Sequence, residues 1–525
     1  MNAAENATKN AANYGGNGTG ESGSSLVRRV GLVLGPVLFA LILLAPDLGG
    51  LEGAARGAAA LTAWMAVWWI TEAVPLEATA LLPIVVYPLT GVVSASQVTL
   101  HYGNNIIFLF LAGFLLSVAI QKWGLHQRIA LRIIMLVGFS PARMVLGFMV
   151  ATSFLSLWIS NSATAMMMVP IGLAVLRQLE EILRERNPSL NTRPEHFPLG
   201  PALMLGIAYA ASIGGIGTLI GSPPNAIFAG YVATAFGRTI SFVEWLMFGL
   251  PVAVVGLLVA WVYLVFIAHR MPDLHIPGAE EVIKRAYAQL GPMSAAEKRV
   301  ATVFAAVAAM WIARGFLEAP LAAAGLQGLT DTTIGIAGAL ALFLIPAGTR
   351  TETGRSDGQR LITWNDTSGV PWGVLLLFGG GLALAAGIEG SGAARWAAER
   401  LSGLQGLSPL VAVTLVVTLV IFLTEVTSNT ATATIFMPVM AGLGAGLGVH
   451  PYLLMIAAAT AASCAFMLPV ATPPNAIVFG TGYMKLKDMM RAGFWLNVTF
   501  VVIISICSYW WIPVAWGISV TWPGP

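Results

Sequence analysis

The stretch Ile213-Gly-Gly-Ile-Gly-Thr-Leu-Ile-Gly-Ser-Pro-Pro-Asn225 interrupts a long run of apolar residues. Its four glycines and paired prolines are incompatible with one continuous helix. A shorter copy, Val470-Ala-Thr-Pro-Pro-Asn475, lies 250 residues further on. Each copy follows a polar signature, which reads Ser160-Asn-Ser-Ala-Thr164 in the first case and Ser428-Asn-Thr-Ala-Thr432 in the second. The chain therefore carries the same pattern twice: a polar signature and then a broken apolar segment.

The composition is that of an integral membrane protein. Of the 525 residues, 57% are hydrophobic and 10% are charged, whereas soluble domains carry about 25% charged residues. The net charge of +3 gives no reason to expect a nucleic-acid partner. The two cysteines and six scattered histidines do not form a disulfide framework or a metal-ligand set. We therefore predict an all-α polytopic membrane protein that is not an enzyme and has no organic cofactor.

Apolar runs of roughly 20 residues mark the expected membrane spans. Residues 1–27 lack such a run and are predicted to be a disordered tail, and the first transmembrane helix is expected within 28–50. We predict about 11 transmembrane helices, at about 30–46, 57–71, 78–93, 105–121, 202–234, 244–268, 298–316, 332–347, 372–388, 452–482 and 492–516.

Two further apolar stretches, 144–176 and 410–446, do not fit as simple spans. The first is too long for one helix across a ~30 Å core and too short for two crossings. Arg143 and Arg177 flank it, and both favour the cytoplasmic side. A re-entrant hairpin with its tip at the polar signature satisfies these constraints. The alternative is one long tilted helix with a polar kink.

The two halves of the chain align with each other. With an offset of 268 residues, Asn161 matches Asn429, Phe110 matches Phe378 and Pro170 matches Pro438. Such a repeat is typical of transporters built by duplication. We therefore predict repeat units at 51–270 and 298–525, joined by a cytoplasmic linker at 271–297.

The number of spans in each unit predicts an inverted repeat. Hairpin 144–176 would then open to the cytoplasm and hairpin 410–446 to the outside. Basic residues mostly agree with a cytoplasmic N-terminus and an external C-terminus, although Arg395 and Arg400 fall on the other side. The expected location is the plasma membrane (the inner membrane in a bacterium), with multiple crossings and lipid as a partner.

The repeated polar segments suit an ion and an anion. Carbonyl groups and the amide oxygen of Asn161 or Asn429 suit a hard cation such as Na⁺, and the hydroxyls of Ser162 and Thr430 suit a carboxylate. Half-helix N-termini add positive potential. The broken segments would contribute the carbonyls of Gly221 and Ala471 to the cation sites, with Ser222 and Thr472 facing the substrate. The alternative is that these small residues only let helices pack closely.

Together with Trp68-Trp-Ile-Thr-Glu-Ala-Val-Pro-Leu-Glu-Ala-Thr-Ala-Leu-Leu-Pro83, these motifs closely resemble the divalent-anion/sodium symporter (DASS) family, in its bacterial dicarboxylate form. The resemblance implies a dimeric elevator-type cotransporter of Na⁺ and a C4 dicarboxylate such as succinate, malate or fumarate. It implies cation ligands at Ser156, Ser160, Asn161, Gly221, Thr424, Thr427, Asn429 and Ala471. It implies substrate contacts at Asn161, Ser162, Ser222, Asn429, Thr430, Thr472 and Pro473. Ser162 departs from the threonine usual in the family.

The signatures contain no lysine or arginine, so bound Na⁺ would have to supply the countercharge to a dianion. We therefore expect Na⁺ to bind first, with at least two ions per dianion. The acids in or near spans are Glu72, Asp331, Glu389 and Glu425. We favour structural roles for Glu72 and Glu425 over proton coupling, with Glu72 at a span end and Glu425 fixing the base of its hairpin.

Other functions stay open. The same hydroxyls and amides would serve a sodium/sulfate or sodium/citrate cotransporter, or a sodium-independent dicarboxylate exchanger. A membrane enzyme would need a catalytic constellation, which we do not find in the sequence, and a non-transporting receptor is a further alternative.

Overall fold

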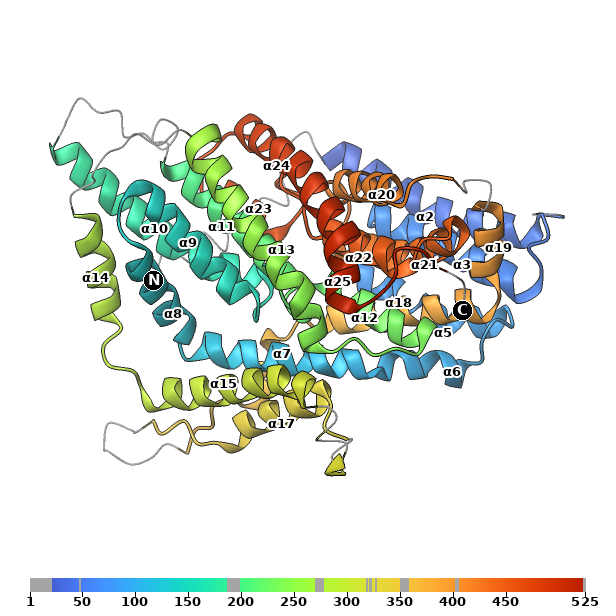
Figure 1. Ribbon diagram of the computed structural model, residues 1–525, viewed down its shortest axis with the longest axis horizontal. Coiled ribbons are helices and arrows are strands. Elements are labelled where there is room, and N and C mark those ends of the chain that lie inside the picture. Colours follow the sequence, from blue (N-terminus) through green and yellow to red (C-terminus); the bar gives the residue numbers. More distant parts are fainter. Residues whose placement is uncertain are drawn as a thin grey trace.

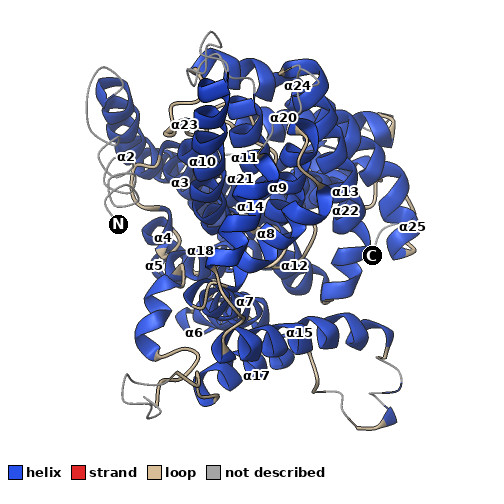
Figure 2. Ribbon diagram, turned by 90° about the vertical axis from the view of Figure 1, so that its left-hand side faces the viewer, coloured by secondary structure: helices blue, strands red, loops and turns tan. Residues whose placement is uncertain are grey.

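The computed structural model describes residues 21–46, 49–186, 199–269, 278–317, 320, 323–325, 328–349, 358–401 and 406–522. Within these ranges every regular element is a helix, apart from two isolated β-bridges. Figures 1 and 2 show these helices from two directions. The predicted all-α membrane fold is confirmed. The linker residues 271–277 and the tail residues 1–20 lie outside the described residues.

Nine helices of the described ranges are long and apolar enough to cross a membrane. Two of them, α10 (Asn161–Arg186) and α21 (Asn429–Leu447), fall in the segments predicted as hairpins. The first span, α2 (Glu21–Leu44), begins inside the predicted tail, so the tail boundary at 27 is wrong. A helix propagates at little cost once an apolar segment has nucleated it.

The predicted span 78–93 is also wrong as a continuous helix. It consists of α4 (Leu76–Thr79) and α5 (Leu82–Leu89), with a break between them. Pro83 lies in the first turn of α5, where its missing N–H and fixed φ favour a new helix start.

Both hairpins are helix–turn–helix units. The first consists of α9 (Pro141–Ser156) and α10, and the second of α20 (Pro409–Thr424) and α21. Residues 157–160 and 425–428 form the turns beside the two polar signatures, and the two arms of each hairpin are in contact. The alternative of one long kinked helix is therefore wrong. The α10 arm extends past residue 176, where the first hairpin was expected to end.

The two Pro-Pro-Asn segments break their spans as predicted. In the first half, α11 (Leu199–Ile216) is followed by α12 (Pro223–Phe236). In the second half, α22 (Pro451–Ala462) is followed by α23 (Pro473–Phe479). Each Pro-Pro pair starts the helix after the break, where a proline needs no hydrogen-bond partner for its nitrogen.

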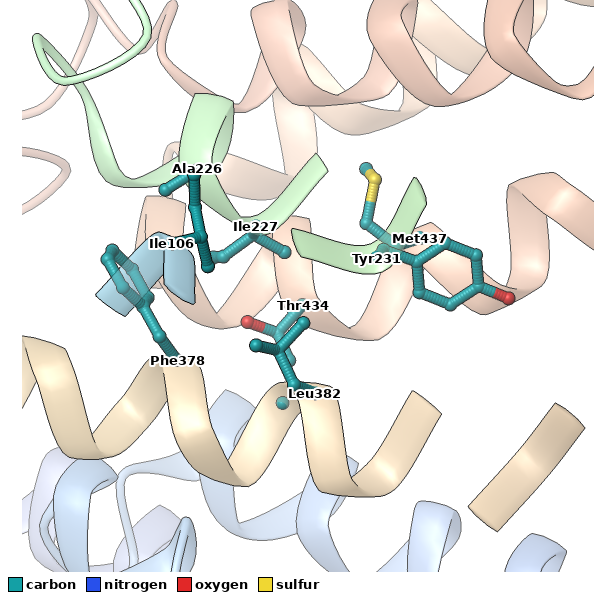
Figure 3. Close-up of a pocket in the computed structure, with 9 residues that line it drawn as sticks. Ile106, Ala226, Ile227, Tyr231, Phe378, Leu382, Thr434 and Met437 are labelled. Atoms are coloured by element: carbon teal, nitrogen blue, oxygen red, sulfur yellow. The ribbon is translucent and has the colours of Figure 1, made fainter. Parts of the chain in front are cut away.

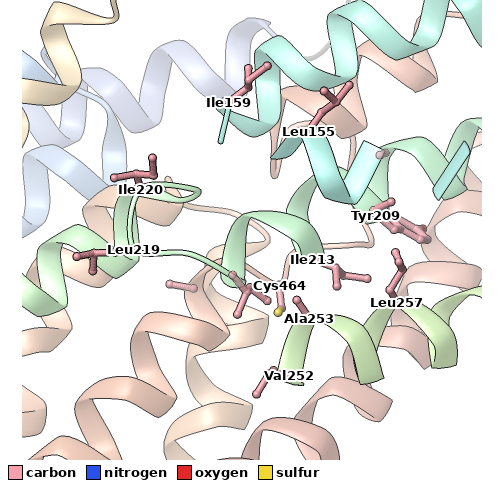
Figure 4. Packing of buried hydrophobic residues seen from close by; sticks show 14 of the residues in the cluster. Leu155, Ile159, Tyr209, Ile213, Leu219, Ile220, Val252, Ala253, Leu257 and Cys464 are labelled. Carbon is pink, nitrogen blue, oxygen red and sulfur yellow. The ribbon is translucent and has the colours of Figure 1, made fainter. Parts of the chain in front are cut away.

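The halves interlock at these breaks. Helix α12 packs on α21 of the other half, and α23 packs on α10. Figure 4 shows part of the apolar core, in which Leu155, Tyr209, Ile213 and Leu257 of the first half belong to the same buried cluster as Cys464 of the second half. Burial at this junction therefore holds together elements that are about 250 residues apart in the sequence.

The remaining helices frame this centre. In Figure 1, α8 and α14 lie at one end of the long axis and α19 lies at the other, while α7, α15 and α17 run along one side. Their bounds are α3 (Gly53–Thr71), α6 (Ala95–Leu100), α7 (Asn105–Lys122), α8 (Leu125–Val137), α13 (Phe242–Val262), α14 (Ala279–Gln289), α15 (Ala295–Phe316), α17 (Asp331–Leu344), α18 (Trp372–Gly390), α19 (Ala393–Leu401), α24 (Leu486–Ile506) and α25 (Ile512–Trp516).

Candidate functional site

The first hairpin tip brings a hydroxyl, an amide and a backbone carbonyl together. Ser156 Oγ lies 2.8 Å from the side-chain amide of Asn161 and 2.7 Å from the carbonyl oxygen of Ala211. With its nitrogen turned inward, the amide also donates to the carbonyl oxygens of Ala211 (3.0 Å) and Gly221 (3.3 Å). Turned the other way, it would complete an all-oxygen cluster, which is the ligand type that hard cations prefer.

The second tip repeats this arrangement. Thr424 Oγ1 lies 2.7 Å from Asn429 Oδ1 and 3.1 Å from the carbonyl oxygen of Ala462. Thr424 and Asn429 follow their first-half counterparts by 268 residues, and Ala462 follows Ala211 by 251. The structure therefore contains two half-sites with the same hydroxyl, amide and carbonyl groups. Because Ala211 and Ala462 act through their backbones, no side-chain motif in the sequence indicated them.

Glycines in the first break allow the close approach. A β-carbon on Gly215 would lie 2.4 Å from Asn161 Oδ1. A β-carbon on Gly221 would lie 2.6 Å from the carbonyl oxygen of Gly215 and 3.0 Å from that of Ser156. A β-carbon on Gly221 would therefore clash with the backbone, whereas one on Gly215 would displace the side-chain amide of Asn161. The predicted residues Ser156, Asn161 and Gly221 therefore lie together, with carbonyl groups around them.

The asparagine of each Pro-Pro-Asn motif stabilises the broken segment before it through side-chain hydrogen bonds. Asn225 Nδ2 donates to the carbonyl oxygens of Gly215 (2.9 Å) and Thr218 (2.8 Å). Asn475 Nδ2 donates to Ala465 (3.0 Å) and Leu468 (3.1 Å), which are the equivalent positions. Both asparagines are fully buried. These amides bind carbonyl groups that a broken helix leaves without partners, a role that the sequence analysis missed although the motif was noted.

Several predicted cation ligands make contacts within their own tips. Ser160 Oγ accepts from the N–H of Ala163 at 3.4 Å. Thr427 Oγ1 lies 2.7 Å from Thr432 Oγ1 and donates to the carbonyl oxygen of Leu423. Their side chains therefore stabilise the turns. The N–H of Ala471 bonds to Leu468, as the N–H of Gly221 bonds to Thr218.

The predicted substrate residues differ in their surroundings. Ser162 and Thr430 lie in the first turns of α10 and α21 and are partly exposed. Pro473 is exposed. Thr472 is buried and caps α23 by accepting from the N–H of Asn475.

Ser222 is engaged with the other half of the molecule. Its Oγ lies 2.9 Å from Ser463 Oγ, and the side chains of both residues are buried. The expectation that Ser222 simply faces the substrate is therefore incomplete in this structure. Ser463 is a further candidate that sequence reasoning did not identify, because it lies outside the polar signatures and the Pro-Pro-Asn segments.

Three of the four acids named from the sequence have structural roles. Asp331 accepts from the N–H of Phe242 (2.7 Å) and pairs with Arg314 (3.1 Å). Glu72 caps the end of α3, as expected for a span end. Glu425 contacts the break that follows α22. The expectation that Glu425 fixes the base of its hairpin is therefore wrong, because it lies at the tip.

A narrow crevice is lined by other residues. Figure 3 shows it between α7, α12, α18 and α21, with Ile106, Ile227, Phe378 and Leu382 among its lining residues. Its lining is mostly apolar and contains none of the predicted site residues. We therefore place the candidate site at the hairpin tips and breaks.

Comparison with known proteins gives consistent matches. The family model described as the sodium:sulfate symporter transmembrane region matches residues 26–517. The chain is 46% identical over 497 residues to the sodium-dependent dicarboxylate transporter SdcS of Staphylococcus saprophyticus, covering 94% of this chain and 93% of that protein. It is also 46% identical to SdcS of Staphylococcus aureus over 496 residues, with the same coverage.

Two solved transporter structures share the fold. The YdaH transporter of Alcanivorax borkumensis superposes with a TM-score of 0.55 at 13% identity, over 90% of this chain and 100% of that one. MtrF of Neisseria gonorrhoeae superposes with a TM-score of 0.53 at 12% identity, over 91% and 94%. At these identities the likeness concerns the fold alone.

Proposed function

The chain belongs to the sodium:sulfate symporter family, and from this premise we propose that it is a sodium-coupled symporter that imports C4 dicarboxylates such as succinate, malate or fumarate. Its relatives at 46% identity are named sodium-dependent dicarboxylate transporters. The protein is a multi-pass membrane protein. Sulfate and citrate are the competing substrates, because hydroxyl and amide groups also bind those anions.

The observation that carries the proposal is the pair of matching half-sites. One Na⁺ would bind at each tip, with Asn161 and Gly221 in the first site and Asn429 and Ala471 in the second. Ser156, Ser160, Thr424 and Thr427 are the further proposed ligands. Amide, hydroxyl and carbonyl oxygens fit Na⁺ well, since hard cations take oxygen ligands. Burial at membrane depth makes such polar clusters costly unless they serve a function.

The dianion would bind between the two tips. The proposed contacts are Asn161, Ser162, Ser222, Asn429, Thr430, Thr472 and Pro473. Because the signatures contain no lysine or arginine, two Na⁺ ions would balance the two negative charges. We therefore propose that Na⁺ binds first and that the carboxylates bind afterwards, with at least two ions per dianion.

The large-scale movement is part of the same proposal. We propose a homodimer in which the interlocked centre, formed by the hairpins and the broken spans, moves as an elevator against the framing helices. The contacts of α12 with α21 and of α23 with α10 support a single moving body. We keep the inverted-repeat units at 51–270 and 298–525, with the N-terminus cytoplasmic and the C-terminus external.

Uptake of radiolabelled succinate into proteoliposomes tests the proposal. We expect accumulation with an inward Na⁺ gradient and none with an equal K⁺ gradient, and unlabelled malate, citrate and sulfate as competitors rank the anions. Uptake that needs internal dicarboxylate and no Na⁺ would identify an exchanger and overturn the cation sites. Asn161→Ala and Asn429→Ala should each abolish uptake with normal membrane insertion, and wild-type rates in either variant would remove the site assignment.

A further inference from the structure

The two broken spans differ in length. Helix α11 continues to Ile216, but α22 ends at Ala462, whereas Ile216 corresponds to Phe466 in the repeat. The second break is therefore about one turn longer. It removes the N–H groups of Phe466, Met467 and Leu468 from a helix. An N–H group without a partner is costly at the membrane depth that we expect for the hairpin tips.

One side chain binds all three of these groups. Glu425 Oε1 accepts from the N–H of Phe466 (2.7 Å) and Met467 (2.9 Å), and Oε2 accepts from Leu468 (3.0 Å). Asn497 of α24 donates its Nδ2 to Oε1 at 2.7 Å. Glu425 is only 3% exposed and Asn497 is fully buried. The carboxylate, which belongs to the second hairpin, thus receives four hydrogen bonds from other parts of the chain.

In the first half, no carboxylate occupies the equivalent position at the hairpin tip. The position that corresponds to Glu425 is Leu157, whose carbonyl oxygen accepts from the hydroxyl of Thr218. The N–H of Gly217, the first residue after α11, donates to the carbonyl oxygen of Gly214 in the last turn of that helix (2.9 Å). A shorter break therefore needs no carboxylate. The two repeats contain the same half-site groups, but different hydrogen bonds connect each hairpin tip to its broken segment.

We propose that Glu425, supported by Asn497, is the positioning residue of the second half-site. It holds segment 463–472 unwound and fixes the hairpin tip to it. Thr424 and Asn429 flank the turn at the hairpin tip, and Ala471 lies in the unwound segment to which Glu425 binds. The carboxylate thereby sets the spacing between the two groups that bind the second Na⁺, without being a ligand itself. The effect on Na⁺ binding rests on the proposed function. The hydrogen bonds between Glu425 and the backbone of residues 466–468 can be tested without a transport assay.

Hydrogen exchange in the purified protein tests the fastening directly. The amides of residues 466–468 should be protected in the wild type, and Glu425→Leu, which copies the first half, should speed their exchange by about tenfold or more. Glu425→Gln keeps one acceptor oxygen and should be intermediate. Glu389→Gln is the matched control, because that carboxylate is exposed on α18. Exchange in Glu425→Leu as slow as in the wild type would overturn the proposal.

Na⁺ titration of uptake tests the consequence. Glu425→Leu should raise the half-saturating Na⁺ concentration about tenfold, with the succinate KM at saturating Na⁺ changed by less than about threefold. An unchanged Na⁺ dependence would overturn the positioning role. If Glu425→Leu does not fold, Asn497→Ala removes a single donor and should shift both readouts in the same direction. Wild-type uptake without Na⁺ would instead refute the proposed function, and the exchange measurement would still decide the fastening.

Discussion

Replacing Gly215 by alanine should weaken the first Na⁺ site with little effect on folding. The new β-carbon would lie 2.4 Å from Asn161 Oδ1 and 3.1 Å from Asn161 Cγ. The amide would have to withdraw by about 0.6 Å to reach even the shortest contact that real β-carbons make. Cation ligands tolerate shifts of only about 0.2 Å, so Asn161 would be lost as a ligand.

The expected loss of Na⁺ affinity can be estimated from the contact between Asn161 and the ion, which the substitution would remove. A polar contact to a charged group contributes about 1.5–3 kcal/mol, which corresponds to roughly a 10- to 150-fold weaker affinity. The assay is Na⁺-dependent thermal stabilisation of the purified protein, followed by Na⁺ titration of succinate uptake. Gly390→Ala is the control, because its β-carbon would meet nothing within 4 Å. Unaltered Na⁺ affinity in Gly215→Ala would refute the placing of Asn161 at the cation.

Three further predictions follow from contacts outside this position. Asn475→Ala should lower the melting temperature and abolish uptake, because two buried carbonyl groups lose their donor; a wild-type melting curve would contradict this role. Burial and the charge of Arg238 lower the pKa of His450 to about 4, so the unfolded state, with a histidine pKa of about 6.5, binds protons more readily. Thermal stability should therefore fall as the pH drops from about 6.5 to about 4, and His450→Gln should flatten that profile. Cysteines at Ser96 of α6 and Lys284 of α14 should react with an impermeant reagent from opposite sides of the membrane, and labelling from one side would contradict the inverted repeat.

The breaks and hairpins were predictable because their causes are local. Proline and glycine stop a helix through their own backbones, so Pro223 and Pro473 mark the starts of α12 and α23 in the sequence itself. The matching polar signatures then predicted which side chains of the two half-sites correspond.

The remaining features depend on partners that are distant in the sequence. Helix α22 ends at Ala462, well before the next proline, Pro469, and Glu425 binds the N–H groups that are released. Ser222 meets Ser463 across 241 residues. Local propensity gives no sign of either contact, because tertiary hydrogen bonds decide where the helix stops. For the same reason, the carbonyl groups of the half-sites could not be assigned from a side-chain motif.

The interlocking of the repeats has a consequence for biosynthesis. Ser222 is synthesised well before Ser463, and at about 5–20 residues per second the interval is roughly 10–50 s. During that time α12 and α10 lack the helices of the second repeat on which they pack. The nascent first repeat would hold polar tips and unpaired backbone groups within lipid or the insertion machinery. The polar tips and the unpaired backbone groups are buried only when the second repeat is complete. Chains truncated before that point should therefore be targets for membrane proteases.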